Sequence, residues 1–230
     1  RWIIKLNNKV QDVKFTNRKD LFNLFNKGPV TPDHVIRIKS EPLIIPNKHL
    51  SSSKMISSHV NAYIKKYKNY FKKYKKNIRN SKIADPLPRI IILEGIGFLS
   101  IGLNKKEMQV SYDIFDAMKK VIIKANLVSK FKSINNTDIF KMEYWPLERA
   151  KLNNQNTKKF NGNVAVITGG AGKIGSAIAN KFINENIEVI LLDKNFKNLD
   201  VNIKKKCLCI VCDLTNNSQI NKALNRILKL

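Results

Sequence analysis

The sequence has few acidic residues, few cysteines and no long apolar runs. It holds 17 Asp and Glu against 43 Lys and Arg in 230 residues, a formal net charge of +26. Its apolar runs, such as Ile90–Leu93 and Val189–Leu192, are only as long as a strand, whereas a membrane-spanning helix needs about 20 apolar residues. The chain begins at Arg1, and no signal-like segment follows. We therefore expect a soluble, cytoplasmic protein with no membrane partner.

Cysteine and histidine are both too scarce to suggest a structural metal or a disulfide framework. The three cysteines lie together at Cys207, Cys209 and Cys212. An odd, clustered set without a fourth ligand argues against both a disulfide framework and a metal site. We interpret these cysteines as small apolar side chains packed in a strand. The three histidines show no spacing typical of metal ligands, so we predict no metal site within this sequence.

The positive charge has two explanations that the sequence leaves open. Lysine, isoleucine and asparagine make 95 of the 230 residues, and all three share A/T-rich codons. Lysine outnumbers arginine 36 to 7, although arginine is the better reader of phosphate. Composition alone therefore explains the charge. The alternative is a basic nucleic-acid-binding protein that uses a helix rich in Lys and Tyr at residues 51–80.

That expected helix carries aromatic residues at spacings of three and four. These residues are Tyr63, Tyr67, Tyr70, Phe71 and Tyr74. The spacing predicts one aromatic face and one lysine face. Such a helix either packs its aromatic face on a core, with lysine stems along its edges, or offers that face to RNA or to a membrane surface.

The patterning divides the chain into residues 1–152, a polar linker at 153–160 and residues 161–230. The first part predicts helices at 17–26, 51–80 and 104–128, a helical stretch at 138–151 that is interrupted at Pro146, a helix starting at Thr31-Pro32 and a buried strand at 89–94. The last part predicts strands at 163–167, 187–193 and 207–213, with helices at 174–184 and 217–230. Its strand–helix–strand rhythm is typical of a parallel sheet.

A glycine-rich turn lies between the first predicted strand and helix of the last part. Gly170, Gly172 and Gly175 form a G-x-G-x-x-G pattern, and Asp193 ends the next strand. A tight turn, a backbone close to a pyrophosphate and a helix packed on a strand all favour residues without a Cβ. Asp193 could accept hydrogen bonds from ribose hydroxyls and would repel a 2′-phosphate. We therefore expect NAD rather than NADP, with Lys194 as an opposing influence.

The segments VAVITGGAGKIGSAIANKF, LLDKN and VCDLTN resemble the start of the short-chain dehydrogenase/reductase family. Thr168-Gly169 would begin the cofactor loop, and Asp213-Leu214 would contact the adenine. Lys173 stands where the common family pattern has a glycine, but Gly169, Gly172 and Gly175 satisfy an alternative spacing. The resemblance implies cofactor binding by Thr168, Gly169, Gly170, Gly172, Lys173, Ile174, Gly175, Asp193, Asp213 and Leu214.

The segments GPVTPDHVIRIKSEPLII, ADPLPRIIILEGIGFLSIGLNKKE and DIFKMEYWPLERAKL resemble bifunctional proteins that join a class II aldolase domain to a short-chain dehydrogenase. The resemblance implies that residues 1–152 end an aldolase-like domain and that 161–230 begin an NAD-binding Rossmann domain. The implied fold is α/β: a half-Rossmann βαβαβ unit preceded by a mixed α/β aldolase tail. The implied substrates are a sugar phosphate such as rhamnulose 1-phosphate and an aldehyde or alcohol. The resemblance also implies a homo-oligomeric parent and no specific nucleic acid partner.

The catalytic residues of both families are absent from the sequence. No tyrosine is followed four residues later by lysine, the pair that short-chain dehydrogenases use, and no His-x-His of an aldolase metal site occurs. His34, in TPDH, either has a structural role at a helix start, which we favour, or contacts substrate in the full protein. The sequence is therefore expected to be a fragment truncated at both ends and inactive alone. A divalent metal such as zinc is expected only in the missing aldolase part.

Overall fold

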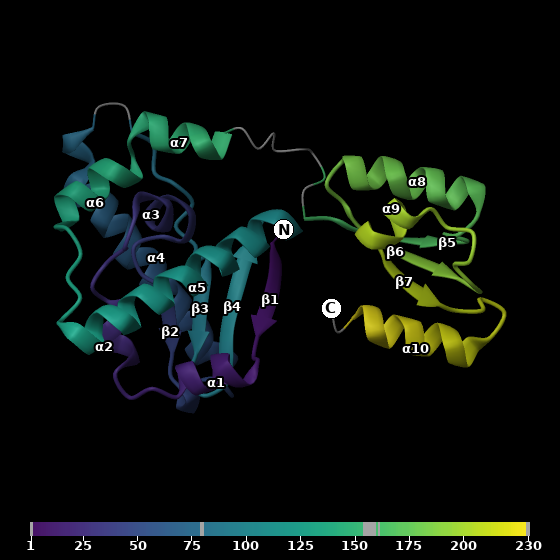
Figure 1. The fold of residues 1–230 in the computed structure, drawn as a ribbon, viewed down its shortest axis with the longest axis horizontal. Helices are drawn as coiled ribbons and strands as arrows, with labels where there is room; N and C mark the ends of the chain where they lie inside the picture. The colour runs from purple at the N-terminus through teal and green to yellow at the C-terminus, as the bar shows by residue number, and fades with distance from the viewer. Residues whose placement is uncertain (1, 79–80, 154–159, 161, 229–230) are drawn as a thin grey trace. The chain divides into compact units, whose positions relative to one another are not determined.

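The computed structural model describes residues 2–78, 81–153, 160 and 162–228, and the chain divides into two compact units (Figure 1). One unit is formed mainly by Ile3–Gly102 and Lys106–Asn156, and the other mainly by Thr157–Leu230. The predicted linker at 153–160 lies largely outside the described residues.

The first unit contains a mixed four-stranded sheet in the order β1-β4-β3-β2. β4 pairs antiparallel with both β1 and β3, whereas β2 pairs parallel with β3. β3 confirms the strand predicted at 89–94, but β2 and β4 were not predicted from the sequence. The strands are β1 (Ile3–Asn7), β2 (Leu43–Ile45), β3 (Ile90–Leu93) and β4 (Gly97–Gly102).

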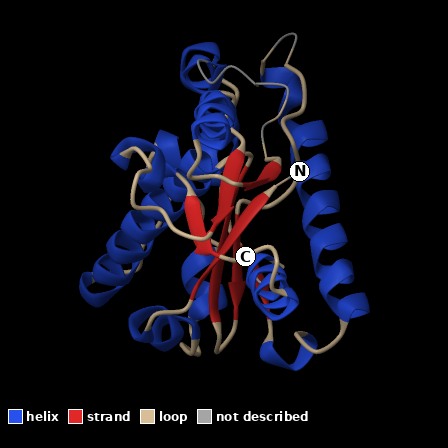
Figure 2. Cartoon of the chain, turned by 90° about the vertical axis from the view of Figure 1, so that its right-hand side faces the viewer, coloured by secondary structure: helices blue, strands red, loops and turns tan. Residues whose placement is uncertain are grey.

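Helices surround this sheet, and the longest of them crosses one of its faces (Figures 1 and 2). Phe115, Met118 and Ile122 of that helix, α5, are fully buried against Ile90 and Ile92 of β3, because they recur every three or four residues. The helices are α1 (Val10–Thr16), α2 (Leu21–Phe25), α3 (Pro32–Ile38), α4 (Ser53–Tyr74), α5 (Lys105–Val128), α6 (Asn136–Glu143) and α7 (Pro146–Asn153), with 3-10 turns η1 (Asn47–His49) and η2 (Lys75–Asn77).

The helix predicted at 51–80 is shorter, and its aromatic face packs on the protein. α4 runs from Ser53 to Tyr74 and continues as η2. Tyr67 and Phe71 are buried against the rest of the unit, whereas the lysines that follow Ile64 along the helix are exposed. The structure therefore supports the amphipathic interpretation of this helix.

The second unit is a parallel sheet in the order β5-β6-β7, as the strand–helix–strand rhythm predicted. α8 and α9 cover one face of the sheet and α10 covers the other (Figure 1). The sequence did not predict α9. The elements are β5 (Val164–Thr168), α8 (Lys173–Asn184), β6 (Glu188–Asp193), α9 (Val201–Lys206), β7 (Leu208–Val211) and α10 (Asn217–Ile227). The α/β fold class, a parallel βαβαβ unit after a mixed α/β unit, is thus confirmed.

The three cysteines lie in the apolar clusters on the two faces of the second unit's sheet. Cys207 and Cys209 pack half-buried in the cluster beneath α8 and α9, and Cys212 is buried beneath α10. Burial raises the pKa of the Cys207 thiol to about 11, so this thiol is protonated and unreactive at neutral pH. Of the helices described, none combines the length and apolar character needed to cross a membrane.

Candidate functional site

The turn between β5 and α8 requires glycine at Gly169 for its backbone conformation and at Gly170 for its close packing. Gly169 lies in the left-handed region with φ +62°, which is unfavourable for residues with a Cβ. The Gly170 N–H donates to the Leu192 carbonyl at 3.2 Å. A Cβ on Gly170 would lie 2.7 Å from Leu191 Cβ. The turn is therefore held tightly against β6.

The start of α8 packs directly on this turn. A Cβ on Gly175 would lie 2.3 Å from the Gly169 carbonyl oxygen, so only glycine lets the helix approach so closely. At the N-cap, a Cβ on Gly172 would meet only that same oxygen, at 3.3 Å. Lys173, Ile174 and Gly175 form the first turn, where backbone N–H groups have no carbonyl partner within their helix. This end of the helix can receive an anion.

Asp193, at the end of β6, connects the second strand to the turn. Its Oδ2 accepts a hydrogen bond from the Ala171 N–H at 2.9 Å, and its Oδ1 accepts one from the Lys194 N–H at 2.7 Å. Each carboxylate oxygen keeps a lone pair for a further donor. The sequence predicted Asp193 as a ligand residue but did not predict that it also fixes the turn.

Asp213 follows β7 and is held in a fixed orientation. Its Oδ1 accepts hydrogen bonds from the Thr215 N–H at 2.9 Å and the Thr215 hydroxyl at 2.8 Å. Its Oδ2 lies 3.2 Å from Lys194 Nζ. The Thr215 hydrogen bonds, together with Lys194, lower the pKa of Asp213, because they stabilise its ionised form. Leu214 beside it is exposed.

The structure gathers the predicted cofactor residues at one edge of the sheet. Thr168, Asp193 and Asp213 end or follow β5, β6 and β7, which are adjacent and parallel, so their carboxyl ends meet. In open α/β sheets this is the edge where ligands bind. Sequence reasoning missed Thr215, although an Asp two residues before a Thr is a common turn signal.

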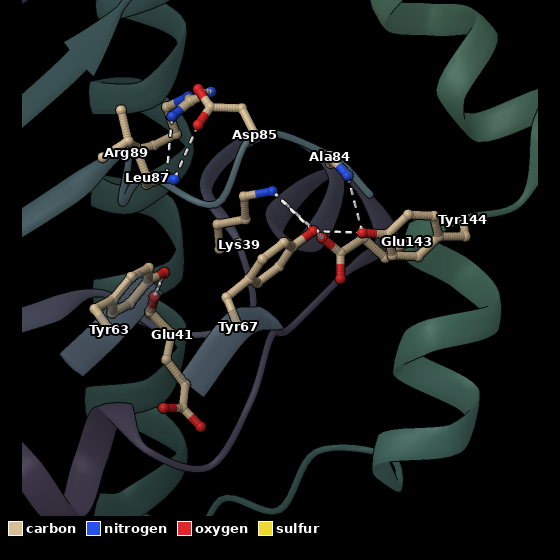
Figure 3. Close-up of polar contacts among 10 residues, drawn as sticks. All are labelled: Lys39, Glu41, Tyr63, Tyr67, Ala84, Asp85, Leu87, Arg89, Glu143 and Tyr144. Carbon is tan, nitrogen blue, oxygen red and sulfur yellow. Dashed lines mark hydrogen bonds and ion pairs between the residues drawn. The ribbon is translucent and has the colours of Figure 1, made fainter. Parts of the chain in front are cut away.

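A second polar cluster, in the first unit, was not predicted at all (Figure 3). Lys39 Nζ donates to Tyr67 Oη at 3.0 Å, and Tyr67 Oη donates to Glu143 Oε1 at 2.6 Å. Tyr144 Oη lies 2.7 Å from Tyr67 Oη and accepts from the Ala84 N–H at 3.2 Å. These residues come from distant parts of the sequence, and no local pattern connects them.

Lys39 is the most constrained member of that cluster. Its ammonium lies 3.5 Å from Glu143 Oε1, and both side chains are buried. Its backbone is left-handed, with φ +72°. Burial lowers the pKa of Lys39 to about 8, although the Glu143 charge opposes that shift. Tyr67 Oη is occupied by three neighbours, so the cluster connects the end of α3 with α4 and α6. Glu143 Oε2 is buried without a hydrogen-bond partner among the described residues.

Each of the three histidines has a hydrogen-bond partner within the protein. The His34 Nδ1 accepts from the Thr31 N–H at 3.1 Å, and the buried ring closes the first turn of α3, which is the helix-start role inferred from the sequence. His49 Nδ1 and His59 Nε2 lie 2.8 Å apart, a pairing that their spacing did not suggest. Across the described residues, no group of three or more metal-ligating side chains is present.

Comparisons with known proteins divide the chain in two. Residues 1–152 match the family described as aldolase class II, second domain, and residues 163–230 match short chain dehydrogenase. An uncharacterized oxidoreductase, YuxG, of Bacillus subtilis (strain 168) is 28% identical over 228 residues, which cover 93% of this chain. The chain spans 33% of that relative's length. It therefore belongs to the class II aldolase family through its second domain, which is joined here to a short-chain dehydrogenase domain.

Proposed function

We propose that the second unit binds NAD and serves the dehydrogenase half of a bifunctional sugar-phosphate aldolase and short-chain dehydrogenase. The observation that carries this proposal is the glycine turn before α8 together with Asp193, whose carboxylate accepts the Ala171 N–H at 2.9 Å. The turn offers backbone donors to a pyrophosphate, and Asp193 offers acceptors to a ribose.

The residues present fit the cofactor. The first turn of α8 would hold the pyrophosphate, Asp193 the adenosine ribose, and Asp213 with Leu214 the adenine. The open space in front of Gly172 supports this assignment, because a Cβ there would meet nothing but the Gly169 oxygen. NAD, when bound, supplies the hydride acceptor for oxidation of an aldehyde or alcohol.

The cofactor preference follows from charge. Asp193 carries a carboxylate at the position where a 2′-phosphate would add a second anion, so we propose NAD over NADP. The 2′- and 3′-hydroxyls of NAD can instead donate to Asp193.

The aldolase half of the proposal rests on the first unit. Its match to the aldolase family supports a sugar-phosphate substrate, cleaved with a divalent metal held by residues outside this sequence. The buried aromatic face of α4 favours this function over sequence-specific nucleic acid binding, since Tyr67 and Phe71 are not available for base stacking. We further propose a homo-oligomeric parent.

A calorimetric titration of the 230-residue chain with NAD tests the proposed site. Gly172→Leu should weaken binding at least tenfold, because its side chain would cover the start of α8. The backbone at Gly172 has φ −74° and ψ 166°, which any residue adopts, so the fold should survive. Ala177→Leu, on an exposed part of the same helix, is the matched control and should bind NAD normally. No saturable NAD binding, or equal affinity of Gly172→Leu, would refute the proposal.

A further inference from the structure

We propose that Asp213 strengthens the preference of this site for NAD over NADP, which Asp193 sets, by holding the Lys194 ammonium against its own carboxylate. This inference rests on the proposed dinucleotide site and assigns Asp213 a positioning role there. The distance from Lys194 Nζ to Asp213 Oδ2 is 3.2 Å.

If it were not paired with Asp213, Lys194 could reverse the preference for NAD over NADP. It directly follows Asp193, and its N–H donates to Asp193 Oδ1 at 2.7 Å, so its side chain starts at the ribose end of the proposed site. A cation near this strand end is the usual means of accommodating a 2′-phosphate. A free Lys194 would therefore offset the repulsion between Asp193 and NADP.

The orientation of Asp213 keeps Lys194 occupied. Two hydrogen bonds from Thr215 engage Oδ1, which leaves Oδ2 directed at Lys194. The Asp213 N–H donates to Gln219 Oε1 at 2.8 Å, which anchors the loop to α10. Asp213 is thus a rigid anion, whereas the lysine stem is flexible. The lysine adapts to the carboxylate rather than the reverse.

The strength of this effect is limited by solvent. The Lys194 side chain is 65% exposed and that of Asp213 is 31% exposed. Exposed ion pairs are weak, so releasing Lys194 should change relative affinities about two- to fivefold rather than by orders of magnitude. This is measurable as a ratio of dissociation constants for the two cofactors.

The experiment measures NAD and NADP affinities of the 230-residue chain by calorimetry for four forms: unmutated, Asp213→Asn, Lys194→Gln and the double variant. Asparagine can still accept from Thr215, so the loop is retained while the charge is lost. We expect Asp213→Asn to shift the affinity ratio about two- to fivefold toward NADP. Lys194→Gln alone should leave the ratio nearly unchanged, because Lys194 is already engaged.

The double variant decides whether Asp213 acts through Lys194. We expect the double variant to lose the shift of the affinity ratio toward NADP that Asp213→Asn shows. An equal gain in the double variant would mean that only the charge of Asp213 matters, and it would overturn the inference. If Asp213 also contacts the adenine, loss of that contact weakens the binding of NAD and NADP equally. It therefore cancels in the ratio of their dissociation constants.

A charge-matched control and the unmutated chain separate the two proposals. Glu185→Gln removes one negative charge at the far end of α8 and should not move the ratio. An unchanged ratio in Asp213→Asn, with both cofactors bound, refutes this inference alone. Binding of neither cofactor by the unmutated chain refutes the proposed function, and this inference with it.

Discussion

Lys39 shows how a single residue can depend on partners far away in the sequence. A buried ammonium is costly unless it is paired and hydrogen-bonded. Here Glu143 and Tyr67 supply the pairing, and the Tyr67 ring lies 4.1 Å from the Lys39 ammonium. The left-handed backbone of Lys39 adds strain that these contacts must offset.

We expect Lys39→Met to lower the free energy of unfolding of the first unit by about 3–5 kcal/mol, because Glu143 would remain buried without its cation. Adding Glu143→Gln should recover part of that loss. Urea unfolding followed by fluorescence measures both effects. Lys68→Met, at an exposed position of α4, is the control and should change stability little. Equal losses in Lys39→Met and Lys68→Met would show that the buried pair does not stabilise the unit.

Asp193 holds the glycine turn and is also proposed to bind the ribose, and two substitutions can separate these roles. Asp193→Ala removes the carboxylate that accepts from the Ala171 N–H and that would accept from a ribose. It should therefore weaken NAD binding strongly and reduce the difference in affinity between NAD and NADP. Asp193→Asn keeps an amide oxygen for Ala171, so it should preserve the turn while losing the charge. Titration with both cofactors measures this. Equal affinities of the unmutated chain for NAD and NADP would contradict a ribose-directed Asp193.

At the scale of an element, α4 carries aromatic residues on one face and lysines on the other. Aromatic residues every three or four positions face the protein. Tyr63 Oη donates to the Glu41 carbonyl at 2.8 Å and Tyr67 Oη donates to Glu143, whereas Tyr70 Oη is buried without a hydrogen-bond partner among the described residues. Lysines cover the outer face. The helix therefore presents mainly lysine charge to a partner, since Tyr67 and Phe71 are buried and Tyr63, Tyr70 and Tyr74 are half-buried.

We expect any nucleic acid binding by α4 to be nonspecific and strongly salt-dependent, because lysines release counterions without reading bases. Replacing four exposed lysines of one stripe by glutamine should weaken binding and flatten its salt dependence. These are Lys65, Lys68 and Lys72 of α4 and Lys76 of η2, which continues the helix. Fluorescence anisotropy with duplexes of different sequence, over a salt series, measures both. A clear base preference at physiological salt would instead support the nucleic-acid-binding alternative.

At the scale of the whole molecule, the second unit carries the proposed NAD site, but the sequence lacks the Tyr-x-x-x-Lys pair expected to transfer the proton. Hydride transfer from an alcohol requires an acid or base at the reacting oxygen. No tyrosine in the sequence has a lysine four residues later.

The 230-residue chain should therefore bind NAD without oxidising alcohols or aldehydes. Incubation with NAD and a panel of short alcohols, followed by NADH absorbance, should give no turnover above the protein-free rate. NAD binding measured on the same sample is the control for an intact site. Turnover that disappears in Gly172→Leu would show that the chain contains a catalytic group that the sequence did not reveal.

Local patterns in the sequence determined the elements that depend on neighbours along the chain. The helix start at Thr31, the aromatic spacing of α4 and the glycines of the β5–α8 turn each act within a few residues, so their geometry follows from sequence alone. The parallel sheet followed in the same way, because continuous apolar strands alternate with helices.

Only the tertiary structure decided the pairings between distant residues. β2 is a three-residue strand that pairs with β3, and β4 pairs with both β1 and β3. No local signal marks either strand. The Lys39–Glu143 pair and the Lys194–Asp213 pair likewise join separate elements. Such contacts depend on how elements pack and on how much water the packing removes, and neither quantity is encoded in residue spacing.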